Sequence, residues 1–238
     1  MFKNSKRGKT VAIIQSNYIP WKGYFDMINY ADEFVLLDEV QYTRRDWRNR
    51  NKIKTSQGLH WLSIPVDVKG KFDIPLSEVT IADQSWSTSH WKTLIHTYGK
   101  APAFDEVLPW LEPLYKSPPP RLSEINKSFI EGINRYLDIK TPIHWSNSFQ
   151  TPMDKTMRLL SICKALNAGC YLSGPSARDY LNVKLFQDEG IEVEWMDYSD
   201  YPEYPQLYPP FLHDVSILDL IFNTGKSSGM YMKSFGSL

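Results

Sequence analysis

Short, nearly uninterrupted apolar runs alternate with amphipathic stretches along most of this chain. The runs at 11–14 and 33–38 are apolar at nearly every position, which is typical of strands covered on both faces by helices. Between them, residues 24–30 carry apolar side chains at helical spacing. A strand, a helix and a strand in this order predict the start of a parallel α/β sheet.

The middle of the chain changes to a helical pattern. Residues 59–68 predict a third strand, which Pro65 places toward a sheet edge, and residues 77–81 predict one more short strand. Helical spacing then covers 85–98, 104–115 and 122–136, with a breaker rich in proline at 116–120. We interpret about 85–138 as a helical insertion.

The strand and helix alternation resumes after the insertion. Strands are predicted at 142–145, 170–173 and 191–195, and helices from Thr151 to about 167, at 177–186 and at 216–223. The overall prediction is an α/β, Rossmann-like fold: a mostly parallel sheet flanked by helices, with the helical insertion between its two halves. Residues 1–10 are predicted to be a disordered tail, and 11–238 one domain.

Composition excludes several classes of protein. The 27 Lys and Arg balance the 27 Asp and Glu, so net charge does not favour a nucleic-acid or membrane-surface binder. Cys163 and Cys170 are too few for a disulfide framework, and we expect both to be buried thiols. No run is long enough to span a membrane, and no apolar core follows the basic N-terminus as in a signal peptide. We expect a soluble, cytoplasmic protein.

Aromatic residues are unusually abundant. They make up 14% of the chain and include 8 tryptophans. Aromatic rings often line pockets that bind rings or sugars, although each one could equally belong to the core.

Two unusual segments, 15–23 and 38–50, follow predicted strands directly. Ligands of open parallel sheets bind outside the carboxyl ends of the strands, so we place the site there. The second segment leads into a basic run that extends to Lys54, with Trp47 among the charges. A charge run is often only a solvated face. Here its position favours contact with a phosphate or carboxylate, and Arg45 and Arg50 are the leading candidates because arginine binds such groups through two hydrogen bonds.

A second junction follows the strand at 170–173. Gly174 allows close approach of the backbone, Ser176 is placed to cap the predicted helix, and Arg178 would lie in its first turn. This arrangement resembles the second signature of the nucleotidylyltransferase superfamily, which binds the phosphates of ATP. The alternative is an ordinary capped helix with a surface arginine.

The first junction resembles the other half of that superfamily's site, where a His-x-Gly-His turn opens the first helix. The turn here is Trp21–Lys22–Gly23–Tyr24, which keeps the glycine and has neither histidine. Lys22 could neutralise phosphate charge, but it could not act as the neutral donor that imidazole provides.

Histidines and known motifs add little. The five histidines share no metal-ligand spacing, so we predict no metal site. His90, within the insertion, is a candidate general base. No G-x-S-x-G elbow, Walker A motif or G-x-G-x-x-G fingerprint is present, which excludes three common classes of enzyme.

Several segments together resemble the WbqC-like protein family. They read IIQSNYIPWKGYFD, FVLLDEVQYTRRDWRNRNKIK, WLSIPV, KAPAF, LSGPSARDYL and YPQL followed by FLHDVSILDLIFNTG. The resemblance covers residues 11–225, and its first two segments are specific. Families of this kind are associated with bacterial gene clusters for O-antigen and other surface polysaccharides. Carried over by position, the residues it implies are Gln15, Tyr18, Trp21, Gly23, Asp38, Gln41, Arg45, Asn49, Arg50, Ser173, Gly174, Ser176, Arg178, Tyr180 and Gln206.

The resemblance implies a role in making or decorating a sugar precursor. Together with the two nucleotide-like junctions, it leads to the hypothesis of a transferase that attaches an acyl or aminoacyl group to an amino-sugar nucleotide. Lys22 and the arginines would stabilise phosphate charge, and Asp38 or His90 would accept the amine proton. No cofactor is firmly implied, and ATP with magnesium would serve only a route through an acyl adenylate; transfer from a thioester or charged carrier is the other route. The expected partners are a nucleotide-linked amino sugar and the acyl or aminoacyl donor, without nucleic acid or membrane insertion, and with homo-oligomerisation left open. The alternative is a non-catalytic subunit that binds a nucleotide sugar or scaffolds the pathway.

Overall fold

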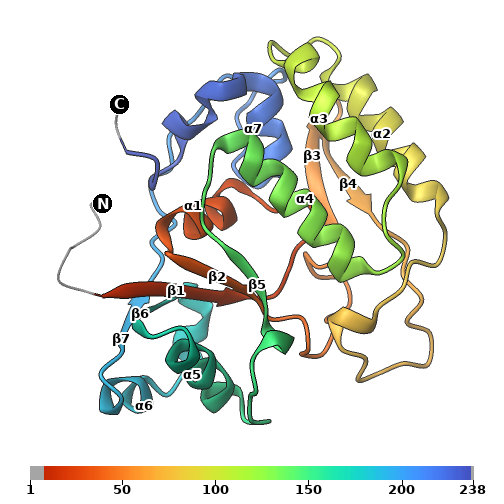
Figure 1. Ribbon diagram of the computed structural model, residues 1–238. Helices are drawn as coiled ribbons and strands as arrows, with labels where there is room; N and C mark the ends of the chain where they lie inside the picture. The colour runs from red at the N-terminus through yellow and green to blue at the C-terminus, as the bar shows by residue number, and fades with distance from the viewer. Residues whose placement is uncertain (1–7, 237–238) are drawn as a thin grey trace.

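A parallel sheet of five strands forms the centre of the computed structural model, which describes residues 8–236. Its order is β5-β2-β1-β6-β7, so β1 is the middle strand and has β2 on one side and β6 on the other (Figure 1). This arrangement confirms the predicted Rossmann-like α/β fold. The strands are β1 Lys9–Ile14, β2 Glu33–Leu36, β5 Ile143–Trp145, β6 Ala168–Ser173 and β7 Glu192–Trp195.

Helices cover the sheet and form the insertion. The insertion consists of α2, α3 and α4, whose starts agree with the predicted ones and whose ends differ by one residue at most. The expected disorder of residues 1–7 lies outside the described residues, whereas Lys9 and Thr10 belong to β1. The helices are α1 Lys22–Tyr30, α2 Ser85–Tyr98, α3 Phe104–Lys116, α4 Leu122–Leu137, α5 Lys155–Ala165, α6 Val183–Asp188 and α7 Ile217–Thr224, with short 3-10 segments η1 Leu76–Glu78, η2 Ser146–Ser148, η3 Pro175–Asp179 and η4 Gly225–Tyr231.

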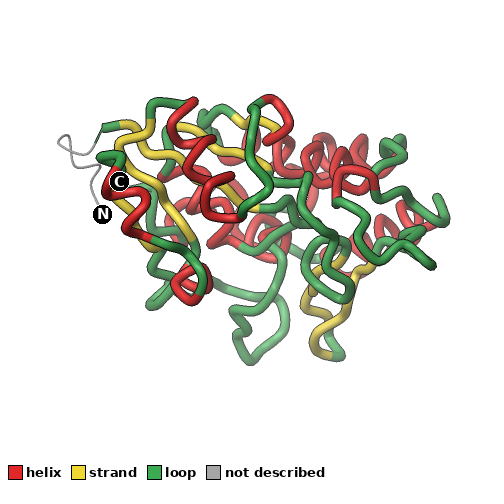
Figure 2. Tube along the Cα trace, turned by 90° about the horizontal axis from the view of Figure 1, so that it is seen from below, coloured by secondary structure: helices red, strands yellow, loops and turns green. Residues whose placement is uncertain are grey.

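The alternation of side chains along β1 divides the core into two parts. Ala12 belongs to a large apolar cluster that includes α1, the insertion and α7, whereas Val11 and Ile13 pack with residues of α5 and α6. The two helical layers are visible on opposite sides of the sheet in Figure 1. Figure 2 shows helices lying beside the strands in a second view. Burial on both faces explains why the central strands are continuous apolar runs.

The segment predicted as a charge run and a third sheet strand forms a separate antiparallel hairpin. Strand β3 Arg50–Thr55 pairs with β4 Gly58–Ser63, and neither belongs to the parallel sheet. The sequence pattern did not predict a strand in the basic run, and it placed residues 59–68 toward an edge of the main sheet. Strand β3 was missed because alternate basic residues can occupy one face of a strand while Asn51 and Ile53 are buried on the other. Gly58, with φ of 100°, permits the tight connection.

Two further local predictions are wrong. Residues 77–81 form no strand, because η1 and isolated bridges at Thr80 and Ile81 take their place. The helix expected to start at Thr151 begins at Lys155, because the Asp154 side chain accepts a 2.8 Å hydrogen bond from the backbone N–H of Met157. A carboxylate in this position satisfies a free N–H group of the first turn, so the chain before it need not be helical.

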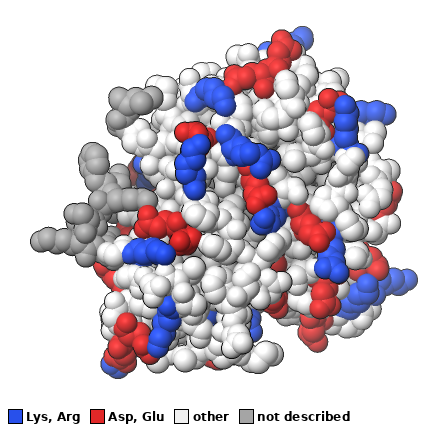
Figure 3. Space-filling model, in the orientation of Figure 1, with Lys and Arg blue, Asp and Glu red and all other residues white. Residues whose placement is uncertain are grey.

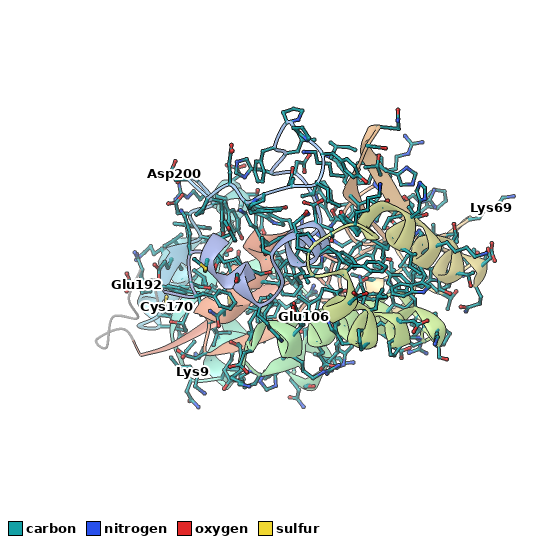
Figure 4. The ribbon with its side chains drawn as sticks, turned by 90° about the horizontal axis from the view of Figure 1, so that it is seen from above. Lys9, Lys69, Glu106, Cys170, Glu192 and Asp200 are labelled. Atoms are coloured by element: carbon teal, nitrogen blue, oxygen red, sulfur yellow. The ribbon has the colours of Figure 1, made fainter. Side chains whose placement is uncertain are left out.

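The surface reflects the balanced charge of the sequence. Acidic and basic side chains are interspersed on the face drawn in Figure 3. Figure 4 shows Lys9, Cys170 and Glu192, all from the sheet, at one end of the molecule and Lys69, after the hairpin, at the other. Within residues 8–236, no helix combines the length and apolar character that a membrane span requires. Both cysteines are free and buried, as expected, and burial raises the pKa of the Cys163 thiol.

Candidate functional site

The candidate site lies at the middle of the sheet. The chain leaves β1 toward β2 on one side, and it returns to pair β6 on the other side. Such a reversal of strand order opens a crevice beyond the carboxyl ends of the two neighbouring strands, where ligands of open α/β sheets bind. The loop of residues 15–21, which follows β1, starts at this point and is hereafter the β1 loop.

A buried carboxylate, that of Asp38, holds the start of the β1 loop. Asp38 accepts hydrogen bonds from the Ser16 N–H at 2.8 Å and the Ser16 hydroxyl at 2.7 Å. On α4, the Asn126 amide donates to Ser16 Oγ at 3.0 Å and to the Arg48 carbonyl at 2.9 Å. Burial raises the pKa of Asp38 to about 6, partly offset by the Ser16 hydrogen bonds. Asp38 is fully buried, so its direct contacts fix the loop.

The middle of the loop is held by the insertion and the hairpin. The Tyr18 hydroxyl lies 3.0 Å from His90 Nδ1 and 2.9 Å from the Tyr115 hydroxyl. Asn51 of β3 donates to the Tyr18 and Ile19 carbonyls at 3.2 and 3.0 Å. Burial lowers the pKa of His90 to about 4, so its imidazole is neutral at pH 7. The structure thus places Tyr18 and His90 in the core between the loop and α2.

A pocket of about 350 Å³ opens beside the β1 loop. Two tryptophans, Trp21 from the loop and Trp47 from the turn before the hairpin, contribute to its apolar lining. A distant part of the chain completes it, since Ser216 N–H donates to the Lys52 carbonyl at 2.8 Å and brings the preceding residues to the hairpin. This β1-loop pocket is lined by Asn17, Pro20, Trp21, Trp47, Asn51, His213, Asp214 and Val215.

Arg48 is the arginine of the basic segment that reaches the loop. Its guanidinium donates to Asn17 Oδ1 and lies 3.7 Å from Asp46. Arg45 and Arg50, the leading sequence candidates, lie farther along: Arg45 is exposed with φ of 58°, and Arg50 lies 4.3 Å over the Trp61 ring. The sequence pattern did not distinguish among these arginines. Which of them reaches the β1 loop depends on where strand β3 begins, and the sequence pattern did not show that position.

Lys22 is buried at the start of α1. Its ammonium donates to the Pro202 carbonyl at 2.9 Å and lies 4.9 and 5.3 Å from the rings of Tyr201 and Tyr204. Burial lowers its pKa to about 8, while Asp26 opposes that shift. Where the nucleotidylyltransferase turn has histidines, this chain has Trp21, which lines the pocket, and Tyr24, whose hydroxyl donates to the Gln15 carbonyl at 3.2 Å.

Gly23 is required by the ring that lines the pocket. A Cβ built on it would lie 2.4 Å from Cζ2 of Trp21. We therefore expect Gly23→Ala to displace the ring and to lower the free energy of unfolding by about 1–3 kcal/mol, measured by urea denaturation. Gly174→Ala is the matched control, because its Cβ would meet nothing within 4 Å. Equal effects of the two substitutions would contradict this role of Gly23.

The junction after β6 differs from its prediction. The expected helix over 177–186 is absent: η3 covers Pro175–Asp179, and α6 starts at Val183. Ser176 makes no side-chain cap, and Arg178 belongs to the 3-10 segment, with its guanidinium 5.4 Å from the Trp195 ring. Too few residues separate Gly174 from the turn at Tyr180 for a full helix to form.

The remaining residues expected at this junction lie as follows. Ser173 is buried at the end of β6, while Tyr180 is exposed. A second cavity, of about 660 Å³, includes Leu172, Trp195 and Met196 from the ends of β6 and β7. Neither it nor the β1-loop pocket is lined by Ser173, Ser176 or Arg178, so joint anion binding by the two junctions stays a prediction.

The other predicted residues lie in structural networks. Gln15 donates to the Gln41 carbonyl at 3.3 Å, and Gln41 donates to the Phe72 carbonyl at 2.8 Å. Asn49 donates to the Ile64 carbonyl at 2.8 Å. Gln206 donates to Asp219 at 2.9 Å and accepts from Lys54 at 2.6 Å. These contacts hold the side chains of Gln15, Gln41, Asn49 and Gln206 against neighbouring segments of the chain.

Sequence reasoning missed much of the pocket. The lining residues absent from its site prediction are Asn17, Pro20, Trp47, Asn51, His213, Asp214 and Val215. The first four lie in the β1 loop or in the basic run, both of which were recognised as unusual. Residues 213–215 carry no local signal and reach the pocket only through the tertiary fold. Among residues 8–236, no group of three His, Cys, Asp or Glu side chains is arranged to hold a metal ion.

The fold and the pocket define a Rossmann-like α/β protein with a small-molecule-sized pocket beside the loop that follows its central strand. A model of the WbqC-like protein family matches residues 15–231, so the chain belongs to that family. It is 45% identical over 226 residues to an uncharacterized protein, Rv1507c, of Mycobacterium tuberculosis, with 94% of this chain and 98% of that protein covered. No solved structure matches the chain.

Proposed function

We propose that this protein is a transferase that attaches an acyl or aminoacyl group to the amine of a nucleotide-linked amino sugar, in the synthesis of bacterial surface polysaccharide precursors such as O-antigen. The observation that carries the proposal is the β1-loop pocket, with Trp21 and Trp47 in its lining and Asn17 and Asp214 as polar groups. Aromatic rings with a few polar partners suit a sugar ring. Membership of the WbqC-like family supports the choice of pathway in this proposal.

The reaction is formation of an amide bond. The sugar amine attacks the carbonyl carbon of an activated acyl group, the bond from that carbon to its leaving group breaks, and one amine proton passes to a base. His213 is the histidine that lines the pocket: His90 is buried against Tyr18, and His144 lies 2.7 Å from Glu33. We assign the proton acceptor to His213, because the predicted bases Asp38 and His90 are buried.

The residues of the first turn do not fit an adenylate-forming site of the nucleotidylyltransferase kind. Its histidines are replaced by Trp21 and Tyr24, and the Lys22 ammonium is directed to the Pro202 carbonyl. The proposal therefore requires only an activated acyl donor, and ATP dependence is an experimental question.

The test is a product assay with purified protein. UDP- and dTDP-linked amino sugars are incubated with acyl-CoA, or with glycine and other small acids plus ATP and magnesium, and amide products are detected by mass spectrometry. Pyrophosphate release would identify the adenylate route, and turnover without ATP the thioester route. No amide product across the panel would count against a transferase.

His213→Gln should lower kcat by about 100-fold while KM changes little, because general-base catalysis contributes about 10²–10⁴-fold. His60→Gln, an exposed substitution on the hairpin, is the control and should leave kcat unchanged. If both variants turn over like the wild type, His213 is not the proton acceptor.

A second candidate function is a non-catalytic subunit that binds a nucleotide sugar. The absence of both histidines from the first turn favours it. Calorimetry that shows binding of an amino-sugar nucleotide, together with no turnover in the same panel, would select this function.

A further inference from the structure

The hairpin and the turn before it carry two exposed tryptophans side by side. Trp47 and Trp61 expose 38% and 40% of their surface, and their ring centroids lie 5.5 Å apart at an interplanar angle of 33°. Neither ring is needed to fill the core at this position. The hairpin extends along the margin of the molecule in both Figure 2 and Figure 4. The exposed parts of the two rings are accessible to a ligand.

Two cations lie against the same rings. The Arg50 guanidinium is 4.3 Å from the Trp61 centroid, and the Lys52 ammonium is 5.4 and 5.1 Å from Trp47 and Trp61. The register explains the grouping: Lys52 is directly opposite Trp61, and Arg50 is opposite Ser63, so both cations project from the same face as Trp61. We call Trp47, Arg50, Lys52 and Trp61 the aromatic platform.

The platform is continuous with the β1-loop pocket. Trp47 belongs to both, and Lys52 forms an ion pair with Asp214, which lines the pocket. The pocket volume, about 350 Å³, is near the lower end of the range of about 300–1,000 Å³ for small-molecule sites. A ligand with two rings joined by phosphates would therefore fill the pocket with one ring and extend the rest across the platform.

We infer that the aromatic platform binds a ring-bearing phosphate ester, with the planar ring stacked on a tryptophan and the phosphates paired with Arg50 and Lys52. Aromatic stacking accepts any planar base, and arginine binds phosphate through two hydrogen bonds. This inference rests on the proposed function, because it assigns part of that reaction's substrate to a surface. The chemistry fits the nucleoside diphosphate of the sugar acceptor and the adenosine phosphate of coenzyme A.

Calorimetric titrations with UDP, dTDP, 3′,5′-ADP and coenzyme A test the platform directly. We expect at least one of them to bind wild-type protein, and Trp61→Ala and Arg50→Ala each to weaken that binding about tenfold. Arg50→Lys should recover only part of the affinity, since lysine lacks the planar fork. Leu59→Ala is the matched control: Leu59 is exposed on the same strand and the same face, two residues from Trp61, and its loss should leave affinity unchanged.

The outcomes separate the inference from the proposed function. Preference for UDP or dTDP assigns the platform to the sugar acceptor, and preference for 3′,5′-ADP or coenzyme A assigns it to the donor. Binding that Trp61→Ala weakens, without any turnover, supports the platform and removes the transferase. Turnover with a wild-type KM in Trp61→Ala, absence of binding by all four compounds, or equal binding of inorganic pyrophosphate would overturn the platform.

Discussion

Replacement of Asp219 by alanine will lower the free energy of unfolding by about 3–5 kcal/mol, because three donors lose their acceptor and a buried donor left unpaired costs about 1–3 kcal/mol. Asp219 is 1% exposed and accepts hydrogen bonds from the Tyr98 and Tyr204 hydroxyls, both at 2.8 Å, and from Gln206 at 2.9 Å. Alanine would leave these buried donors without their acceptor. The measurement is urea denaturation followed by tryptophan fluorescence.

Asp188→Ala is the control for this experiment. Asp188 is exposed and forms a 3.0 Å surface ion pair with Lys184, so its loss should change stability by less than about 1 kcal/mol. If the free energy of unfolding falls by less than about 1 kcal/mol in Asp219→Ala, the hydrogen bonds of Asp219 do not stabilise the segment from Tyr204 to Leu212.

The Asp219 network has a consequence for the pocket. It holds Tyr204 and Gln206, and the Gln206 amide oxygen accepts from the Leu212 N–H at 2.9 Å, directly before the lining residues His213 and Asp214. Ligand affinity should therefore fall in Asp219→Ala even at temperatures where the variant is folded. A variant that is folded and binds like wild type would show that residues 213–215 are positioned independently.

Asp38 should make the protein less stable as pH rises from about 4 to about 6. Burial raises its folded pKa from 3.8 to about 6, so the folded state keeps a proton that the unfolded state releases in this window. Stability from this group is fully present below the unfolded pKa and is lost as pH rises through the folded one. A shift of about two units corresponds to about 3 kcal/mol.

The measurement compares wild type with Asp38→Asn at several pH values between 4 and 7. The difference in free energy of unfolding, wild type minus variant, should fall by about 3 kcal/mol across the window, because other titrating groups are common to both proteins. Asp67→Asn, an exposed substitution, should give a curve parallel to wild type. Parallel curves for Asp38→Asn as well would show that Asp38 does not retain its proton in the folded state.

The sequence alone was sufficient to predict the strands and helices that are determined by the periodicity of apolar residues. Burial periodicity determines the apolar runs of β1 and β2 and the helical spacing of α2 and α4. This periodicity can be recognised from neighbouring residues in the sequence. The segment after β1 was also recognisable, since a polar and aromatic turn at a strand end is a local feature. The hairpin was missed because its basic residues alternate along one face of β3, and that pattern resembles a charge run until the pairing partner is known.

Tertiary structure alone decided which side chains share the pocket. Asn17 and Trp47 lie in the recognised segments, but His213 and Asp214 lie more than 150 residues away and are brought there by the Asp219 network and by the Ser216 hydrogen bond to the hairpin. The same packing placed Asp38, His90 and Lys22 in the interior, where burial shifts their pKa values. Burial and long-range contacts depend on how the whole chain packs, so they cannot be predicted from a short stretch of sequence.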